Sequence, residues 1–353
     1  MASEKPIILH LGDPVEWNKA LYDQIASEFT VIRPCLEERQ RDNFLGALKE
    51  KRWGNFQGIF RPFWNTGGEM GRWDAELIPL LPSSLKVYGS AGAGYDWMDV
   101  DILAKHGIIY CNGAQASSEA VADMAIFHII SVFRNMQWSM DGARSGDPTL
   151  WLEAHKNTAF TAHNPRTQIL GIIGLGNIGY TIARKAYACF GMKIYYQDLY
   201  QKSTEQEQAI GASFCATLDE LLAVADCIVL ATPFSGSKII TKETLAKFKK
   251  GGKFVNIARG KLVDEAALVD ALKSGHLSAA GLDVHENEPH VNKDLTKMRN
   301  VTQVRPRLRL TSHTAGGAAE TQIGFERLAM ENVQRVLNGQ EPLTPVNKHL
   351  IEN

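Results

Sequence analysis

A glycine-rich turn near the middle of the chain limits what it can fold into more than any other feature. Gly174, Gly176 and Gly179 stand in a G-x-G-x-x-G pattern between an apolar run, QILGIIG, and an amphipathic run, NIGYTIARKAYACF. A strand followed by this turn and a helix is the opening of a dinucleotide-binding unit. The first glycine permits the tight turn, the second lets the backbone approach a pyrophosphate, and the third lets the helix pack closely. The pattern therefore predicts a parallel α/β sheet with a dinucleotide at the first helical residues, Asn177 and Ile178.

An acidic residue at the end of the following strand indicates which dinucleotide binds. Asp198 closes the run KIYYQD and can accept hydrogen bonds from the ribose hydroxyls. Its carboxylate would repel a 2′-phosphate, so NAD(H) is favoured. Lys202 and Ser203 follow shortly after and can hold a phosphate, so NADP(H) stays open. Enzymes that bind S-adenosylmethionine use similar turns, so the motif alone does not define the chemistry.

The alternation of apolar and amphipathic runs extends over almost the whole chain. With 353 residues, the chain is longer than single hydrophobic cores usually grow, which predicts two domains. Both are expected to be Rossmann-like or flavodoxin-like, with parallel sheets covered by helices on both faces. We predict a substrate-binding (catalytic) domain from residues 1–113 plus 319–353, and a dinucleotide-binding Rossmann domain from residues 114–318. The active site is expected in the cleft between them.

Two segments after the first series of strands are assigned from their local pattern. The run SSEAVADMAIFHIISVFRNMQWSMDGAR is predicted as one long helix with Ser117 or Ser118 as its N-cap. The run GDPTLWLEAHKNTAFTAHNPRTQ lacks a helical period and is predicted as an irregular connection. The longest apolar stretch, AVADMAIFHIISVF, contains Asp123 and His128 and is too short to span a bilayer, so no membrane association is expected.

Charge and cysteine content exclude several classes of protein. Lys and Arg total 38 against 39 Asp and Glu, a net charge of -1, which argues against a general nucleic-acid binder. The 5 cysteines are scattered without a CxxC pair, so neither a disulfide framework nor a zinc site is indicated. The N-terminal apolar run is too short for a secretory signal. We expect a cytoplasmic protein whose ligands are small molecules.

Polar residues follow successive predicted strands of the second domain, where such folds bind ligands. They are Arg259 in VNIARG, Asp283 and Glu288 in GLDVHENEP, and His313 in LTSHTAGG. Reduction of a 2-keto acid by hydride transfer needs three groups: a cation for the substrate carboxylate, a proton donor for the carbonyl oxygen, and a carboxylate that keeps this donor charged. The four residues contain a candidate for each.

Over nearly its whole length the chain resembles the D-isomer-specific 2-hydroxyacid dehydrogenases, and six stretches carry this resemblance. They are GSAGAGYDWMDVD, AVADMAI, GIIGLGNIG, VNIARG, GLDVHENEP and SHTAGG. The sequence HNPR ahead of the glycine turn is similar to the fungal branch that contains D-mandelate dehydrogenase and glyoxylate/hydroxypyruvate reductase-like enzymes. The resemblance implies NAD(P)-dependent reduction of glyoxylate, hydroxypyruvate or an aromatic 2-keto acid to the D-2-hydroxy acid. A sensor that binds NAD, like the corepressors of this fold, and a formate- or phosphite-type dehydrogenase remain as alternatives.

The resemblance also implies roles for individual residues. Arg259 would bind the carboxylate and polarise the ketone, His313 would donate the proton, and Glu288 would keep His313 protonated. Backbone N–H groups of Gly92 and Ala93 would bind the substrate carboxylate. Further positions would line the cofactor: Thr232, Pro233, Ala258, Asp283 and Gly316.

Aromatic residues raise two further expectations. Residues 117–165, with Trp138 and Trp151, resemble the dimerisation arm of the family, so we expect a homodimer in which one of these tryptophans could reach the neighbouring subunit's cleft. In FRPFWNTGG, Arg61 would contact the substrate. Phe63 and Trp64 would either select a bulky 2-keto acid or pack in the core.

The stretch VTQVRPRLRLTSHTAGG contains a part that the family does not explain. QVRPRLR intervenes before Leu310 and is predicted as an exposed loop, with LTSH resuming the strand, because Pro306 cannot donate to a sheet. Its arginines could bind a phosphate, or the loop could displace His313. His285 and His290 flank Glu288, but two histidines without further ligands make a poor metal site, so no metal is expected.

Overall fold

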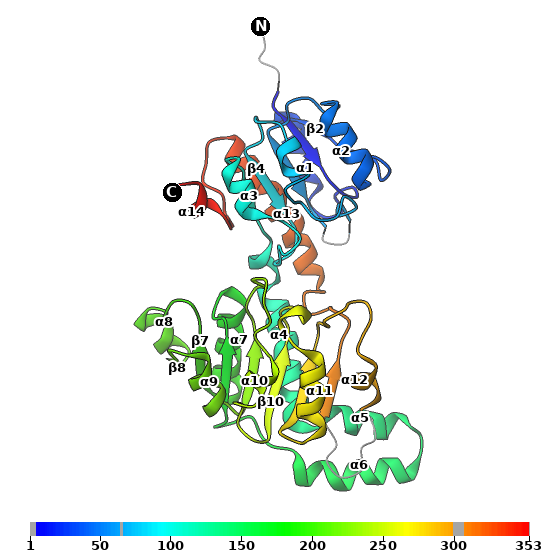
Figure 1. Cartoon of the computed structure of the whole chain (residues 1–353), viewed down its shortest axis with the longest axis vertical. Coiled ribbons are helices and arrows are strands. Elements are labelled where there is room, and N and C mark those ends of the chain that lie inside the picture. Colours follow the sequence, from blue (N-terminus) through cyan, green and yellow to red (C-terminus); the bar gives the residue numbers. More distant parts are fainter. Residues whose placement is uncertain (1–4, 64–65, 299–306, 353) are drawn as a thin grey trace. The chain divides into compact units, whose positions relative to one another are not determined.

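The computed structural model describes residues 5–63, 66–298 and 307–352. The chain divides into two compact units, which are described separately (Figure 1). Unit 1 comprises Met1–Ser117 and Gly317–Asn353, and unit 2 comprises Ser118–Gly316.

Unit 1 is built on a sheet of five parallel strands in the order β2-β1-β3-β4-β5. The strands are β1 (Ile7–His10), β2 (Thr30–Ile32), β3 (Gly58–Arg61), β4 (Val87–Ser90) and β5 (Ile109–Cys111). The helices are α1 (Lys19–Glu28), α2 (Arg41–Lys49), the 3-10 helix η1 (Ile78–Leu80), α3 (Val100–Lys105), α13 (Ala319–Leu337) and α14 (Lys348–Ile351).

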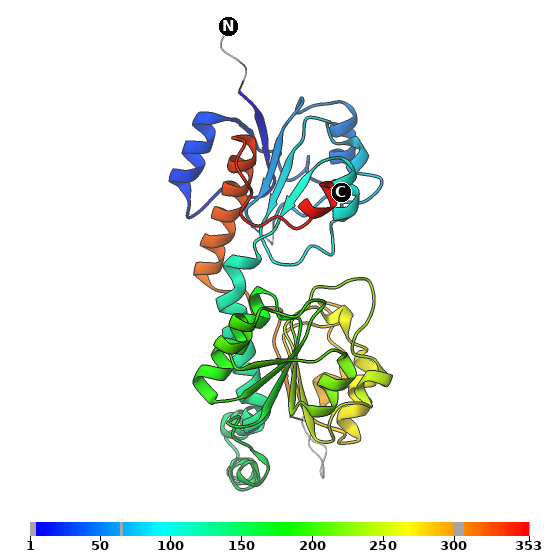
Figure 2. The same ribbon diagram turned by 90° about the vertical axis from the view of Figure 1, so that its left-hand side faces the viewer.

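Helices cover both faces of this sheet (Figure 2). On the side of α1 and α13, Phe29 and Met330 pack around Phe60 of β3. On the side of α2 and α3, Phe44 and Leu103 join the core beneath Tyr88 of β4. Helix α13 approaches β4 closely because Gly89 has no side chain: a Cβ there would lie 2.3 Å from the carbonyl oxygen of Ala329. The last long helix of the chain thus completes the core of the first sheet.

Unit 2 is built on a sheet of seven parallel strands in the order β12-β11-β10-β9-β6-β7-β8. The strands are β6 (Ile169–Ile173), β7 (Lys193–Gln197), β8 (Ala212–Phe214), β9 (Cys227–Leu230), β10 (Gly252–Asn256), β11 (Leu277–Leu282) and β12 (Arg307–Leu310). The helices are α4 (Ala114–Arg134), α5 (Met136–Arg144), α6 (Pro148–Thr161), α7 (Asn177–Phe190), α8 (Thr204–Ala209), α9 (Leu218–Val224), α10 (Lys242–Leu245), the 3-10 helix η2 (Gly260–Leu262), α11 (Glu265–Lys273) and α12 (Lys293–Lys297). The first turn of α4, up to Ser117, belongs to unit 1.

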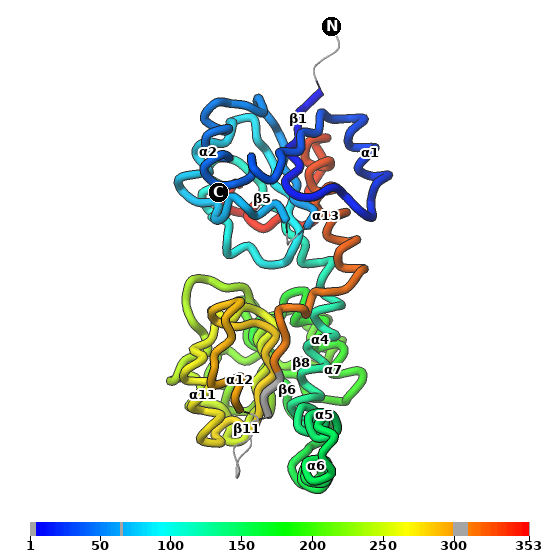
Figure 3. The backbone as a smooth tube through the Cα atoms, turned by 90° about the vertical axis from the view of Figure 1, so that its right-hand side faces the viewer, coloured from blue at the N-terminus to red at the C-terminus, as the bar shows by residue number. Residues whose placement is uncertain are grey.

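The second sheet is also covered on both faces, with α4 and α7 on one side and α11 on the other (Figure 3). Ile129 of α4 and Ile182 of α7 pack against Ile172 of β6. On the opposite face, Leu268 of α11 packs around Phe254 of β10. Both sheets are parallel and both are layered between helices, so the predicted α/β class is confirmed. The strand order of unit 2 reverses between β6 and β9, and such a reversal opens a crevice at the carboxyl ends of the strands.

The prediction of one long helix capped by Ser117 or Ser118 was wrong. Helix α4 begins at Ala114, so both serines lie inside it, and the hydroxyl of Ser117 donates to the carbonyl of Ala114. Asn135 then adopts a left-handed conformation, with φ of 55°, and separates α4 from α5. Asparagine tolerates this conformation better than most residues. Its side-chain amide donates to the hydroxyl of Thr161, a contact that no local pattern reveals.

The segment predicted as an irregular connection contains helix α6. Asp147 caps it by accepting a hydrogen bond from the backbone N–H of Thr149, and Pro148 occupies the first turn. Asp at the N-cap and Pro in the first turn are both standard signals for the start of a helix, but the segment that follows lacks the apolar spacing from which helices are predicted. Helix α6 packs against α5, and Gly142 permits the approach because a Cβ there would lie 2.7 Å from that of Ala154.

Helix α4 is longer than the apolar stretch from which we excluded a membrane span. It has 21 residues with a mean hydropathy of 1.3, so its length and composition alone would allow it to cross a membrane. The expectation that this part of the chain is too short to span a bilayer was therefore wrong. Of the most apolar part of α4, 56% is buried inside the protein, where it packs on the second sheet. It is the covering helix of a sheet.

The strand before His313 begins earlier than predicted. Strand β12 spans Arg307–Leu310 and pairs in parallel with Ala279–Leu282 of β11. The end of QVRPRLR therefore belongs to the sheet, and Thr311 to His313 lie beyond the strand. The assignment of these residues was wrong because pairing with β11, rather than local composition, defines the strand. Residues 303–306 of that segment, and Trp64, lie outside the described residues.

Candidate active site

The glycine turn follows β6, at the point where the strand order of unit 2 reverses. Gly174 has φ of 92°, and a Cβ there would lie 2.9 Å from the carbonyl oxygen of Ala231, just before Thr232 and Pro233. A Cβ on Gly179 would lie 2.1 Å from the carbonyl oxygen of Gly174, so that glycine lets α7 pack against the turn.

The remaining glycine of the motif leaves space. Within the described structure, a Cβ on Gly176 would meet nothing within 4 Å. The next residues, Asn177 and Ile178, open α7, where unpaired N–H groups favour an anion. The turn therefore combines backbone that is held tightly with a helix N-terminus that is open to a phosphate.

Asp198 stands at the rim of this turn. Its Oδ2 accepts a hydrogen bond of 2.9 Å from the backbone N–H of Leu175 and lies 3.3 Å from Nζ of Lys202. Its Oδ1 accepts from the N–H of Leu199. The carboxylate is thus fixed beside the glycine turn, as ribose recognition requires. Together with the open space at Gly176, these residues fit a dinucleotide.

Arg259 follows β10 and is oriented from within its own segment. The side-chain amide of Asn256 donates to the carbonyl of Arg259, and Nη1 of Arg259 donates to the carbonyl of Ala258. The next residue, Gly260, touches the turn after β11: a Cβ there would lie 1.9 Å from the carbonyl carbon of His285. Only glycine fits this approach, which brings the segment of Arg259 against the turn that carries Glu288.

The structure brings Glu288 and His313 into direct contact. Nδ1 of His313 lies 2.9 Å from Oε2 of Glu288. An ionised carboxylate can only accept, so Nδ1 of His313 carries the hydrogen. The imidazole and the carboxylate are 45% and 36% exposed, which leaves Nε2 of His313 accessible to a ligand. His313 itself has φ of 55°, an uncommon conformation that the surrounding structure must hold in place.

Asp283 holds the turn on which His313 lies. The Asp283 side chain is fully buried, and it accepts hydrogen bonds from the hydroxyl of Thr311 and from the N–H groups of Thr314 and Ala315. Its carbonyl accepts from the N–H of His313 at 2.7 Å. We expected Asp283 only as a cofactor contact. Its anchoring role has no signal in the sequence, because Asp283 follows β11 whereas its hydrogen-bond donors follow β12, in the segment that leads to Gly316.

Gly92 and Ala93, which we predicted to bind the substrate carboxylate, lie in unit 1. The carbonyl of Gly92 accepts from the N–H of Gly113, and the carbonyl of Ala93 accepts from the side chain of Asn112. These bonds hold the turn after β4 in place.

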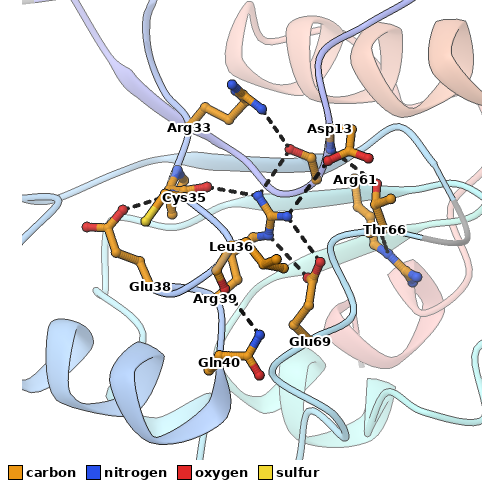
Figure 4. A network of polar contacts seen from close by, with 12 residues as sticks. Asp13, Arg33, Cys35, Leu36, Glu38, Arg39, Gln40, Arg61, Thr66 and Glu69 are labelled. Carbon is orange, nitrogen blue, oxygen red and sulfur yellow. Dashed lines mark hydrogen bonds and ion pairs between the residues drawn. The ribbon is translucent and has the colours of Figure 1, made fainter.

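Arg61 is buried in unit 1, where its guanidinium lies over the ring of Trp97 at 5.0 Å and its Nε donates to the carbonyl of Thr66. The figure shows Arg61 beside Thr66 (Figure 4). Phe63 is buried and packs against Trp17 with ring centroids 6.0 Å apart. These contacts make Arg61 a support for its own loop, and they favour the core-packing alternative for Phe63.

A buried arginine that the sequence did not indicate ties three loops of unit 1 together (Figure 4). Arg39 is 3% exposed and contacts both carboxylate oxygens of Glu69 at 3.1 Å. Its Nη1 donates to the carbonyls of Gly12 and Pro34. These partners follow β1, β2 and β3, so Arg39 fixes the loops at the carboxyl ends of neighbouring strands.

Comparison with known proteins identifies the family. Residues 126–315 match the family model described as the NAD binding domain of D-isomer specific 2-hydroxyacid dehydrogenases. The chain is 35% identical to 4-methyl-2-oxopentanoate reductase A of Aspergillus oryzae over 97% of its length and 98% of the relative's.

Two solved structures resemble the chain as well. The holo form of Rhodotorula graminis D-mandelate dehydrogenase has a TM-score of 0.91 and 41% identity, and the match covers 98% of each chain. A glyoxylate reductase from Paecilomyes thermophila has a TM-score of 0.85 and 36% identity, over 98% of this chain and 99% of that one. The family model spans more than half of the chain and the relatives match almost all of it, so this protein belongs to the D-isomer specific 2-hydroxyacid dehydrogenases, oxidoreductases that bind a nicotinamide dinucleotide.

Proposed function

We propose that the protein reduces small 2-keto acids to D-2-hydroxy acids, with His313 as the proton donor. The observation that carries the proposal is the 2.9 Å contact between His313 and Glu288 beside the segment of Arg259. The names of the relatives support this class of substrate, since they include reductases of 4-methyl-2-oxopentanoate and glyoxylate and a dehydrogenase of mandelate. Glyoxylate, hydroxypyruvate and phenylglyoxylate are therefore the substrates to test first, with 4-methyl-2-oxopentanoate as a branched example.

Each of the three residues has one task in this proposal. The guanidinium of Arg259 pairs with the substrate carboxylate and draws electron density from the neighbouring ketone. His313 holds a proton at Nε2 and gives it to the carbonyl oxygen as charge develops there. Glu288 accepts a hydrogen bond from Nδ1 and places its carboxylate beside the positive charge that His313 carries before it donates. A reduced nicotinamide, when bound at the glycine turn, would supply the hydride.

NAD(H) is the proposed cofactor rather than NADP(H). The carboxylate of Asp198 lies at the rim of the glycine turn, where a 2′-phosphate would meet a like charge. Nζ of Lys202 lies 3.3 Å from that carboxylate and forms an ion pair with it, so the positive charge of Lys202 is already paired.

The proposed assembly is a homodimer formed through the helices α4 to α6. Apolar side chains on α6 face solvent within the described residues: Leu150, Trp151, Leu152 and Phe160. Large apolar residues that cluster on one exposed helix are typical of an interface.

Replacing His313 by alanine tests the proton donor. With NADH and the four keto acids named above, we expect kcat for His313→Ala to fall by about 10² to 10⁴, which is what a general acid contributes. NADH affinity, measured by fluorescence titration, should be retained. His290→Ala is the matched control, because His290 is an exposed histidine of the loop that carries Glu288.

Two outcomes would contradict the proposal. If His313→Ala turned over at the wild-type rate, another group would donate the proton. If the wild-type protein bound NADH but reduced no acid of the panel, an NAD sensor would be the better description.

A further inference from the structure

Two buried histidines without a role in the proposed chemistry both contact Thr311. His128 comes from the middle of α4 and His285 from the turn after β11, and the two side chains are almost completely buried. Nε2 of His128 lies 3.2 Å from the hydroxyl oxygen of Thr311. Nε2 of His285 lies 2.9 Å from the carbonyl oxygen of the same residue. Thr311 is two positions before His313, so both contacts act on the start of its turn.

The direction of each hydrogen bond follows from the partners. The hydroxyl of Thr311 donates its single hydrogen to Oδ1 of Asp283 at 2.6 Å. It can therefore only accept from His128, whose Nε2 must carry a hydrogen. The carbonyl of Thr311 also only accepts, so Nε2 of His285 carries a hydrogen as well. Both imidazoles thus act as donors to Thr311, one to its side chain and one to its backbone.

The ring of His128 fits against the sheet only because the neighbouring strand has a glycine there. On the neighbouring strand β11, a Cβ on Gly281 would lie 2.9 Å from Nδ1 of His128 and 3.0 Å from its Cβ. The helix face around His128 is otherwise apolar, with Ala125, Ile129 and Val132 in the core. A buried imidazole costs free energy unless it is hydrogen-bonded, so its bond to Thr311 is the reason that it is tolerated there.

His285 connects the two partners of the catalytic contact. Its backbone N–H donates to Oε1 of Glu288 at 2.9 Å, while its ring holds Thr311. Its Nδ1 lies 3.8 Å from Oε1 of Glu265, a buried carboxylate that in turn accepts from the N–H of Glu286. The ring therefore lies between the turn of Glu288 and the strand exit that leads to His313.

We infer that His128 and His285 are positioning residues that hold Thr311, and through it the imidazole of His313, in register with Glu288. This inference rests on the proposed role of His313. The left-handed backbone of His313 needs such support, because that conformation is unfavourable for a residue with a side chain. Asp283 fixes the turn after Thr311, and the two histidines fix Thr311 itself.

Phenylalanine and glutamine variants separate hydrogen bonding from packing. Phenylalanine keeps the ring volume without a donor, whereas glutamine can place an N–H near the original Nε2. For His128→Phe and His285→Phe we expect kcat to fall by about 10-fold to 10²-fold, as for a misplacement of about 1 Å. KM for the keto acid and NADH affinity should change by less than about threefold, and the glutamine variants should recover at least half of the loss in log kcat. A fall in kcat with little change in KM indicates that the catalytic group is misplaced while substrate binding is retained.

His276→Phe is the matched control in the same unit. His276 also donates from Nε2 to a backbone carbonyl, that of Leu245 at 3.0 Å, but at the amino end of β11, away from the site. The melting temperature of every variant is measured alongside. If the histidine variants lost stability like His276→Phe but kept kcat within about twofold of wild type, the inference would be overturned.

Thr311 variants keep the test decisive if a phenylalanine variant does not fold. Thr311→Val removes both the acceptor for His128 and the donor to Asp283, so it should lower kcat at least as far as His128→Phe does. Thr311→Ser keeps the hydroxyl and should not lower kcat. Equal kcat for the valine and serine variants would overturn the role of His128. The His313→Ala variant separates failure of the proposed function from failure of the positioning role. If His313→Ala is active, the proposed function fails. If it is inactive while the His128 and His285 variants have normal kcat, only the positioning role fails.

Discussion

At the residue scale, a single carboxylate is expected to determine the choice of cofactor. The side chain of Asp198 accepts a hydrogen bond from the N–H of Leu175 in the glycine turn. Asp198→Asn removes the negative charge but keeps a side-chain oxygen that can accept this hydrogen bond. We expect the ratio of kcat/KM with NADPH to that with NADH to rise by about tenfold, equivalent to about 1.4 kcal/mol, because a like charge no longer faces the 2′-phosphate and Lys202 is released.

Steady-state kinetics with both cofactors measure this change. Asp219→Asn is the control, since Asp219 forms an exposed ion pair with Lys247 in the same unit. An unchanged ratio for Asp198→Asn would mean that the cofactor preference is set elsewhere.

The candidate residues of the proposed chemistry have a signal in the sequence, whereas the residues that support them have none. Arg259, Glu288 and His313 lie in short motifs next to strand ends, and the structure joins two of them at 2.9 Å. His128 gave no such signal, because a histidine in an apolar helix is usually part of the core. Its partner Thr311 is 183 positions away in the chain, and only the packing of α4 on the sheet brings them together.

At the scale of the elements, a partly buried ion pair joins the loops of unit 1. Arg39 is buried and uses Glu69 as its bidentate partner, so Glu69→Gln leaves the guanidinium without its main counterion. Loss of one partner of a buried pair costs about 3 kcal/mol. We expect that decrease in the opening free energy of β1 and β3, measured by hydrogen exchange. Glu50→Gln, which breaks an exposed pair with Arg52, should cost less than about 1 kcal/mol.

The effect of Glu69→Gln should depend on pH in a defined direction. Burial is the largest single influence and raises the pKa of the Glu69 carboxyl. The hydrogen bonds and positive charge of Arg39, together with the backbone N–H groups of Glu69 and Gly67, outweigh it, so the pKa lies below its usual value of 4.5. A lowered pKa contributes stability above the usual value, and this contribution is lost as the pH falls through the folded-state pKa. The difference between wild type and Glu69→Gln should therefore shrink below pH 4.5. A difference that stayed constant down to full acid unfolding would exclude the ion pair as its cause.

The boundaries of elements could be predicted where local chemistry defines them. Helix α7 begins and ends where its pattern predicts, from Asn177 to Phe190, because a glycine precedes it and another follows it. The break at Asn135 and the start of β12 could not be predicted, since each depends on a partner far along the chain.

At the scale of the whole molecule, the exposed apolar side chains of α6 predict self-association. Phe160 is 86% exposed and Trp151 is about half exposed, so Trp151→Asp and Phe160→Asp should leave the fold of a single chain intact. We expect the wild type to sediment as a dimer and the double variant as a monomer. Leu36→Asp, at an exposed apolar residue of unit 1, is the control and should stay dimeric. Sedimentation of the wild type as a monomer would contradict the proposed assembly.

The sequence by itself determined the α/β class, the parallel sheets and a glycine turn that fits a dinucleotide, and it indicated the candidate residues of the proposed chemistry. These features rest on local periodicity, on glycines that allow tight turns, and on polar residues at strand ends, all of which are visible in short stretches. Only the tertiary structure decided that Asp283 anchors a turn, that Arg39 joins three loops, and that two histidines meet at Thr311. These contacts depend on distances between residues far apart in the chain, and such distances exist only once the helices have packed on the sheets.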